Sequence, residues 1–304
     1  MRPFLLLALA LSFPLSSVAK DAKPVAAESQ FIDRSVVSYP KLLGGHALIE
    51  SSYDPEHFAG GVGLKYQIAN APPGLMFNVF IYPLGDMPAE KAMKTAMDEL
   101  RASFDYAQKQ GLYSDVVVGE PVDFEAPLSP STIIKDESGK KQDAPPPAPK
   151  PGNTKELDPR MRDALAELVA PDRTIGKKLP LSYTFHEAPN QSLAYVFYHQ
   201  LFLIKFRITL PKADMEAADF DVRMDKAVRD LAPGMVVENF GDCGTMTIDV
   251  PDKGEADPGD TGAQLIREMA RIQRLNCANS DGGKTKPGPG REQIVIEFPA
   301  GTWR

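Results

Sequence analysis

Residues 192–210 read SLAYVFYHQLFLIKFRITL and form a long, largely apolar stretch in the second half of the chain. From Phe202 onward, phenylalanine, isoleucine and leucine alternate with a face that carries Lys205, Arg207 and Thr209. A period of two predicts a β-strand. Residues 192–198 are apolar on both faces, which predicts a central strand that is buried on both sides.

A further strand is predicted just before this stretch. Leu181, Tyr183 and Phe185 alternate with polar residues over residues 181–186. The sequence Ala188-Pro189-Asn190-Gln191 contains turn-forming residues. We therefore expect a β-hairpin whose turn lies at residues 188–191.

A helix is predicted after the apolar stretch, over residues 214–231. Pro233-Gly234 follows and is suited to end it. Five apolar residues recur at helical spacing and make one stripe for the core: Phe220, Met224, Ala227, Val228 and Leu231.

The N-terminus has the pattern of a secretory signal peptide. Arg2 precedes an almost wholly apolar run from Phe4 to Leu15, and small residues lead up to Ala19. The apolar run is shorter than the about 20 residues that a membrane-spanning helix needs. We therefore expect residues 1–19 to be cleaved and the mature protein to be periplasmic or secreted, with no membrane span.

The charge of the chain argues against nucleic acid as a partner. The 304 residues include 34 basic and 41 acidic side chains, a formal net charge of −7. Nucleic acids and anionic lipid surfaces favour basic proteins. We therefore expect the partner to be a protein or a small molecule.

Residues 20–124 are expected to form a first α+β unit. Alternating apolar residues predict its strands, and a stripe that includes Met93 and Met97 predicts its helix. The predicted order is strand, strand, helix and strand, at residues 62–68, 77–82, 88–110 and 114–118.

Residues 125–180 are expected to separate this unit from the next. Seven prolines lie between Glu125 and Asn153. Such a composition cannot bury enough apolar surface to offset the entropy lost on ordering, so we expect an extended proline-rich loop. A short helix is predicted from Asp158 to Val169.

Residues 181–304 are expected to form a second α+β unit. Its order of three strands, a helix and a strand resembles the first unit, which suggests a duplicated strand-strand-helix-strand unit. A last helix is predicted from Thr261, which is spaced from Gln264 as in a capping box, with Leu265 and Met269 on its apolar face. The predicted fold class is α+β, with antiparallel sheets covered by amphipathic helices.

Cys243 and Cys277 are the two cysteines of the chain and lie 34 residues apart. In an exported protein such a pair is most simply a structural disulfide. On the chain-entropy account, closing a loop of this size contributes roughly 3–4 kcal/mol to stability.

Cys243 also allows a catalytic interpretation. The sequence Gly241-Asp242-Cys243-Gly244 resembles the nucleophile loop of chymotrypsin-like cysteine proteases, in which a thiolate near a histidine attacks an acyl carbon. His46 would then be the base. Two observations count against this alternative. The fold of those proteases is nearly all β, whereas several helices are predicted in this chain. In addition, an exported thiol would oxidise onto Cys277.

No cofactor or metal site is predicted. The four histidines lack the spacing of a zinc site. Met93 and Met97 could offer thioethers to copper(I), but their spacing among apolar neighbours is typical of a core. The acidic loop from Asp252 to Asp260 lacks the ligand order of an EF-hand, and the chain contains no phosphate-loop or dinucleotide-binding motif.

These observations together predict an exported, soluble envelope protein of non-enzymatic type that binds a protein partner or a small ligand. The alternative is a secreted or periplasmic hydrolase whose catalytic residues are scattered along the sequence, as in the hypothesis for Cys243 and His46.

Overall fold

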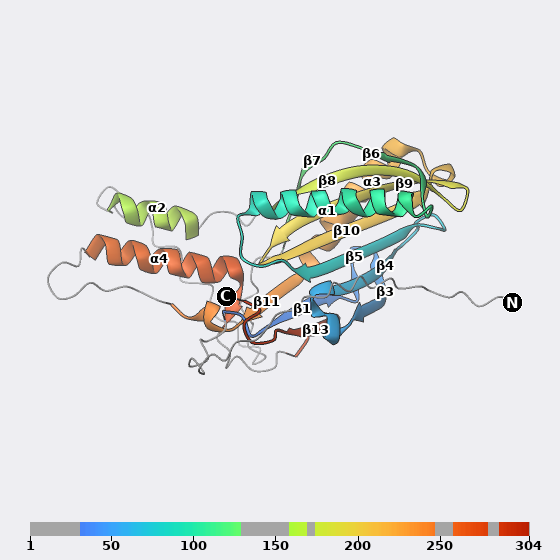
Figure 1. Cartoon of the computed structure of the whole chain (residues 1–304). Helices are drawn as coiled ribbons and strands as arrows, with labels where there is room; N and C mark the ends of the chain where they lie inside the picture. Colours follow the sequence, from blue (N-terminus) through green and yellow to red (C-terminus); the bar gives the residue numbers. More distant parts are fainter. Residues whose placement is uncertain (1–30, 129–157, 169–173, 247–257, 279–285, 304) are drawn as a thin grey trace, which may run out of the picture.

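The computed structural model is mixed α+β, with helices packed against antiparallel sheets, which confirms the predicted fold class (Figure 1). The predicted signal peptide at residues 1–19 and most of the proline-rich and acidic loops lie outside the described residues. The described residues are 31–128, 158–168, 174–246, 258–278 and 286–303.

Within the described residues, nine strands form a large antiparallel sheet. Their spatial order is β2, β3, β4, β5, β10, β9, β8 and β6, and β7 pairs with β8 next to β6. The bounds are β2 Leu42–Leu43, β3 His46–Tyr53, β4 Val62–Ile68, β5 Met76–Pro83, β6 Ser114–Val118, β7 Val122–Ala126, β8 Thr174–Phe185, β9 Ala188–His199 and β10 Phe202–Pro211.

A smaller four-stranded sheet has the order β12, β11, β1, β13. The short strand β12 runs parallel to β11, and the other pairings are antiparallel. The bounds are β1 Arg34–Pro40, β11 Val236–Phe240, β12 Cys277–Ala278 and β13 Arg291–Glu297.

Four α-helices lie in the described part of the chain, together with short 3₁₀ segments. Within that part, no helix is both long enough and apolar enough to cross a membrane. The bounds are α1 Ala89–Lys109, α2 Pro159–Leu168, α3 Ala217–Leu231 and α4 Pro258–Leu275, with 3₁₀ segments at η1 Pro55–Gly60, η3 Lys212–Asp214, η4 Ala232–Gly234 and η5 Asp242–Gly244.

The large sheet is covered on both faces. Helix α1 lies on one face, where Met97, Leu100 and Phe104 pack on β8, β9 and β10. Helix α3 and the small sheet cover the opposite face and share one apolar core with it. The predicted stripe of α3 is buried along its whole length, as expected for an amphipathic helix on a sheet.

Strands β9 and β10 therefore lie in the middle of the molecule. Phe197 and Phe206 point to the α3 face and meet edge to face, with ring centroids 6.0 Å apart. Val196 and Leu203 point to the α1 face and are also fully buried. Burial on both sides, predicted for residues 192–198, is confirmed and extends to β10.

Strands from both halves of the sequence pair with each other. Strand β5 pairs with β10 over eight residues, with Val79 opposite Phe206. Strand β1 lies between β11 and β13 in the small sheet. The helices that follow the β4–β5 and β9–β10 hairpins, α1 and α3, cover opposite faces of the large sheet.

The turn of the β8–β9 hairpin differs from the sequence prediction. The prediction placed it at residues 188–191, whereas β8 ends at Phe185 and β9 begins at Ala188. His186 and Glu187 form the turn, with φ of 47° and 64°. Two successive residues in the left-handed conformation fit the twist of a two-residue hairpin turn. This conformation is uncommon for residues other than glycine, so the composition of His186-Glu187 did not predict the turn.

The last helix begins earlier than predicted. Helix α4 starts at Pro258, so Thr261 lies inside it and is not its N-cap. Helices α2 and α4 lie side by side in the structure (Figure 1). Gly262 of α4 lies close to Met161 of α2. Ala164 and Ala263 are buried, whereas Leu265 and Met269 remain 36% and 42% exposed.

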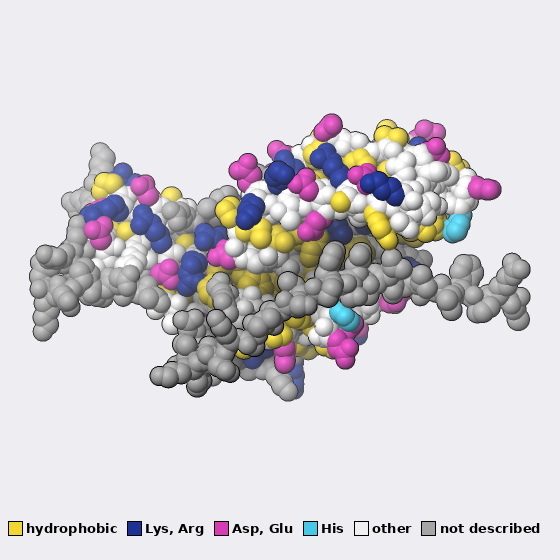
Figure 2. Space-filling model, in the orientation of Figure 1, with side chains coloured by type: hydrophobic (Ala, Val, Ile, Leu, Met, Phe, Trp, Pro, Cys, Tyr) yellow, Lys and Arg dark blue, Asp and Glu magenta, His cyan; other side chains and the backbone are white. Residues whose placement is uncertain are grey.

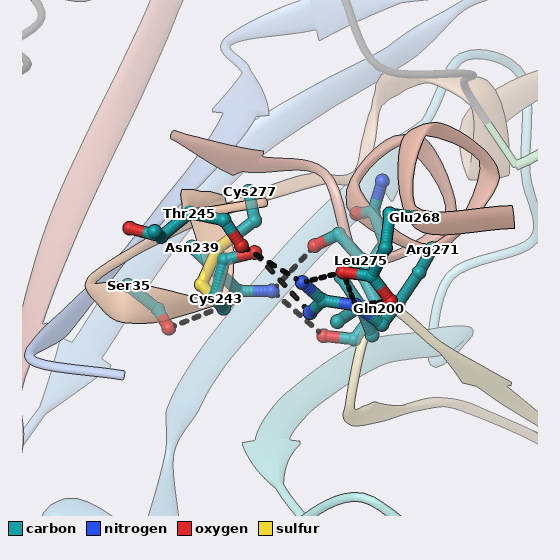
Figure 3. The surroundings of a disulfide bond; sticks show 9 residues. All are labelled: Ser35, Gln200, Asn239, Cys243, Thr245, Glu268, Arg271, Leu275 and Cys277. Atoms are coloured by element: carbon teal, nitrogen blue, oxygen red, sulfur yellow. Dashed lines mark hydrogen bonds and ion pairs between the residues drawn. A yellow bond between two sulfur atoms is a disulfide. The ribbon is translucent and has the colours of Figure 1, made fainter. Parts of the chain in front are cut away.

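The predicted disulfide between Cys243 and Cys277 is confirmed. It links η5, which follows β11, to β12, which follows α4 (Figure 3). Arg271 of α4 reaches the same place and donates to the carbonyl oxygens of Cys243 and Thr245 at 3.3 and 3.1 Å. The disulfide and Arg271 therefore both attach the end of α4 to the small sheet.

A buried asparagine lies beside the disulfide (Figure 3). The Asn239 amide donates to the carbonyl oxygens of Leu275 and Gln200 at 2.7 and 3.2 Å, and its oxygen accepts from the Ser35 hydroxyl at 2.6 Å. One side chain thus joins β1, the β9–β10 turn and the end of α4. These hydrogen bonds satisfy a polar group that would be costly to bury alone.

Replacing both cysteines by serine is expected to lower the free energy of unfolding by roughly 3–4 kcal/mol, because the unfolded chain regains the entropy of an open loop. Chemical denaturation of the wild type and of Cys243→Ser/Cys277→Ser measures the loss. The wild type under reducing conditions is the control and should approach the double variant. A loss below about 1 kcal/mol would contradict a stabilising role of the disulfide.

Candidate functional site

A groove of about 480 Å³ lies on the α3 face of the large sheet, between the first turn of α3 and strand β8. Pro180 and Leu193, which are paired across β8 and β9, lie in its floor. Phe220 and Met215 add apolar walls from α3 and the residues before it. Such a surface suits the apolar part of a small molecule.

The chain before α3 is held against the sheet by a buried glutamine. Gln191 of β9 donates from Nε2 to the carbonyl oxygen of Met215 at 2.7 Å. Helix α3 then starts after Glu216, whose side chain makes no capping hydrogen bond. Asp214, the N-cap predicted from the sequence, lies instead in the 3₁₀ segment η3.

The opposite wall depends on a glycine. The backbone N–H of Gly119 donates to the Pro180 carbonyl oxygen at 2.9 Å, which brings the β6–β7 connection onto the edge of β8. A Cβ at this position would lie 2.8 Å from Cγ of Pro180. Glycine is therefore needed for this close approach.

A buried ion-pair cluster lies along the same side of α3. Lys178 of β8 is 8% exposed, and its Nζ lies 2.6 Å from Asp221 and 2.7 Å from Asp225. The Tyr195 hydroxyl donates to Asp225 at 2.7 Å. Burial, followed by the hydrogen bond to Asp225, raises the pKa of Tyr195, so Tyr195 stays a neutral donor.

Asp221 belongs to both the groove and the cluster. Its side chain is 46% exposed, while that of Asp225 is 22% exposed. Lys178 balances only one of the two carboxylates, and Lys212 and Glu216 in the groove wall offset each other. The site therefore combines apolar walls with a net charge of about −1 from its acidic and basic side chains.

The groove contains few groups suited to catalysis. Its lining, which lies within the described residues, includes no histidine or cysteine. The hydroxyl of Ser192 hydrogen-bonds to the carbonyl oxygen of Ile208 and to Thr209 within the sheet, at 2.8 and 2.9 Å. This arrangement favours binding over nucleophilic chemistry.

The residues of the cysteine-protease hypothesis lie in different parts of the structure. Cys243 follows the small sheet and is bonded to Cys277, so a nucleophilic role would first require reduction. His46 begins β3 of the large sheet and is 1% exposed. Its Nδ1 hydrogen-bonds to the Leu43 carbonyl oxygen at 3.1 Å, and its ring packs on Phe77.

The other residues considered as ligands also have structural neighbours. Met93 and Met97 are buried between α1 and the sheet. His57 pairs with Asp54 at 2.8 Å on the surface. Within the described residues, no three or more histidine, cysteine, aspartate or glutamate side chains lie close enough to hold a metal ion.

Sequence reasoning missed the Lys178 cluster because it began the strand at Leu181. The alternation in fact continues toward the N-terminus, with Leu179 on the α1 face and Lys178 and Pro180 on the α3 face. Asp221 and Asp225 are four residues apart on one side of α3. Both spacings can be read from the sequence. The contact of Lys178 with the two aspartates, however, forms only in the folded chain.

Comparison with protein-family models, with curated proteins and with solved structures found no match to this chain. Function must therefore be inferred from the side chains described above.

Replacing Lys178 by methionine is expected to lower the free energy of unfolding by about 3 kcal/mol, because it leaves Asp225 without its cation. Lys94→Met is the matched control, since Lys94 pairs with Asp98 on the surface and is 77% exposed. Surface pairs of this kind contribute about 0–1 kcal/mol. Denaturant titrations measure both losses, and equal losses would contradict a buried, stabilising cluster.

The pH dependence of stability should include a contribution from His46. Burial lowers its pKa below the usual 6.5, so protonation favours the unfolded chain. The stabilisation that neutral His46 gives to the folded state is present above about pH 6.5 and is lost as the pH falls toward the folded-state pKa. His46→Gln should reduce the drop in unfolding free energy between about pH 7.5 and pH 5.5, as measured in urea. An unchanged drop would rule out His46 as its source.

Proposed function

We propose that this is an exported envelope protein of non-enzymatic type that binds a small amphipathic cation in the groove beside α3. The observation that carries the proposal is the meeting of apolar walls with the half-exposed carboxylate of Asp221. The apolar part of the ligand would lie on Pro180 and Met215, and its cationic group would reach Asp221.

The size of the groove supports a small-molecule ligand. Its volume of about 480 Å³ falls in the range of about 300–1,000 Å³ typical of such sites. Pro180 and Leu193 belong to paired strands of the large sheet, so the floor is formed before a ligand arrives. A preformed surface binds with little loss of conformational entropy.

The charge of the site supports a cation. Asp221 already accepts from Lys178 through one oxygen, and a carboxylate has a second oxygen with free acceptor capacity. The position of Asp221 is fixed by Lys178, which reduces the cost of ordering it on binding. An anionic ligand would instead meet the negative charge that remains on Asp221 and Asp225 after Lys178 has balanced one of them.

Export is supported by two observations from the chain. Residues 1–19 have the sequence pattern of a signal peptide, and the disulfide between Cys243 and Cys277 is typical of oxidising compartments. Both fit a periplasmic or secreted protein.

The hydrolase alternative has no observation that favours it within the described residues. Of the strongest candidate pair, His46 begins β3 of the large sheet, whereas Cys243 lies in η5 after the small sheet and is oxidised. A protein partner in place of a small ligand would fit a flat surface better than this groove.

Calorimetry with decylammonium and decyl sulfate, both below their micelle concentrations, tests the proposal. Decylammonium should bind once per chain, and Asp221→Asn should weaken it about tenfold, the effect of losing one charge-assisted hydrogen bond. Asp98→Asn, which removes an equal charge from the exposed surface of α1, is the control and should leave binding unchanged. Equal affinity for decyl sulfate, or equal effects of the two variants, would contradict the proposal.

A further inference from the structure

Strand β6 lies at the margin of the large sheet and borders the groove (Figure 1). It pairs with β8 on one side, and within the described residues no strand pairs with its other side, the outer edge. The pairing is irregular between Ser114 and Val117 and regular from Val117 to Val118. An edge strand with unpaired backbone groups can take up a further strand from another chain.

The backbone of Val118 is directed to the outer edge. The N–H of the next residue, Gly119, donates to the carbonyl oxygen of Pro180 at 2.9 Å, toward β8. In an antiparallel pair, successive residues direct their backbone groups to opposite sides. The N–H and carbonyl of Val118 therefore point away from β8, where an added strand can bond to them. The Val118 side chain packs on the α1 face.

The groove can take up a side chain of such an added strand. Val117 is 62% exposed and lines the groove at the edge, and Asp221 of α3 lines it as well. One groove therefore connects the edge strand with the half-exposed carboxylate. Lysine and arginine have apolar stems that lie on an apolar surface while the charged end reaches a polar group. Either side chain is an amphipathic cation attached to a peptide backbone.

The charge of the edge also favours a basic partner. The segment that forms β6, β7 and their connection, residues 114–126, contains no basic residue and four acidic ones: Asp115, Glu120, Asp123 and Glu125. Lys177 and Arg101 pair with two of them at the surface, where ion pairs are weak. The outer surface of α1 instead mixes basic and acidic side chains (Figure 2).

The same charge disfavours a second copy of this chain as the partner. Two copies that paired through β6 and β7 would place one acidic edge against another. Like charges that lie directly opposite each other destabilise a pair of strands. A basic peptide from another protein is therefore the occupant that the edge favours.

We propose that the groove binds an arginine or lysine side chain of an extended peptide that adds to the outer edge of β6. This inference rests on the proposed function, because it identifies the amphipathic cation of the groove. The peptide backbone exchanges hydrogen bonds with Val118, and alternate side chains lie beside Val117. The basic side chain among them reaches Asp221. Backbone hydrogen bonds then provide affinity, and the groove provides specificity.

Binding of a labelled peptide, acetyl-Val-Thr-Arg-Thr-Val, to the full, disulfide-bonded chain tests the proposal by fluorescence anisotropy. Arginine and the two valines share one face of the extended peptide. Norleucine in place of arginine should weaken binding about tenfold, and so should Asp221→Asn, because each removes the charge-assisted contact. Asp98→Asn, on the exposed surface of α1, is the control and should leave binding unchanged.

Methylation of the peptide nitrogens distinguishes strand addition from binding of the side chain alone. One peptide is N-methylated at arginine, and the other at both threonines. Successive N–H groups of a strand point to opposite sides, so one of the two peptides should bind about fivefold more weakly and the other should bind unchanged.

Two variants test the edge itself. Val118→Pro removes the outward N–H, whereas Val118→Ala keeps it, and both remove the valine side chain. Peptide binding should weaken about fivefold in Val118→Pro and stay unchanged in Val118→Ala. Decylammonium should bind both variants like the wild type, which also shows that they are folded.

The outcomes separate this inference from the proposed function. Binding of decylammonium without binding of the peptide would overturn the inference alone, and failure of both ligands would overturn both. Equal effects of the two methylated peptides, or equal binding to the two Val118 variants, would contradict strand addition. A dimer in sedimentation velocity that Val118→Pro dissociates would assign the edge to a second copy and would also overturn the inference.

Discussion

The structure depends on the burial of strands β9 and β10 on both faces. Phe197 and Phe206 project from one face and Val196 and Leu203 from the other, and all are shielded from solvent. Each fully buried side chain of this size contributes about 1.5–3 kcal/mol relative to an exposed one. A sheet with two apolar faces is stable only when both are covered, which requires a layer on each side.

The two covering layers have different consequences. On one face, within the described residues, α1 is the helix that packs on the sheet. On the other, α3 and the small sheet share the core, and the small sheet is attached through Asn239 and the disulfide. Helix α3 buries its apolar stripe and also faces strand β8. Its acidic side, with Asp221 and Asp225, therefore meets Lys178, and the groove lies where its first turn leaves the sheet.

Local patterns predicted the elements that depend on local spacing. The period of two in residues 202–210 and the helical stripe from Phe220 to Leu231 both gave elements of the right type and close to the right bounds. The disulfide followed from the chemistry of two cysteines in a chain predicted to be exported. These features are set by neighbours along the sequence or by composition.

The remaining features depend on residues far apart in the chain. The two-residue turn at His186 and Glu187 is imposed by the register of β8 on β9, which overrode the turn composition of Pro189 and Asn190. The pairing of β5 with β10 brings together residues more than 100 positions apart. The candidate site has the same origin, because Lys178 and Asp225 become partners only after α3 has packed on β8.

Two lysines of the large sheet, one buried and one partly buried, illustrate how the partner determines the way in which a charged side chain is stabilised. Lys178 and Lys205 both extend from central or near-central strands, on opposite faces of one sheet. A buried ammonium is costly in either place. On the α3 face two carboxylates offset that cost, so the charge is kept and the pair fixes the helix. On the α1 face the rings of Phe80 and Tyr82 lie 5.1 and 5.6 Å from the Lys205 amine and attract its charge more weakly than a close carboxylate does. The same residue type is therefore held by ion pairs on one face of the sheet and by aromatic rings on the other.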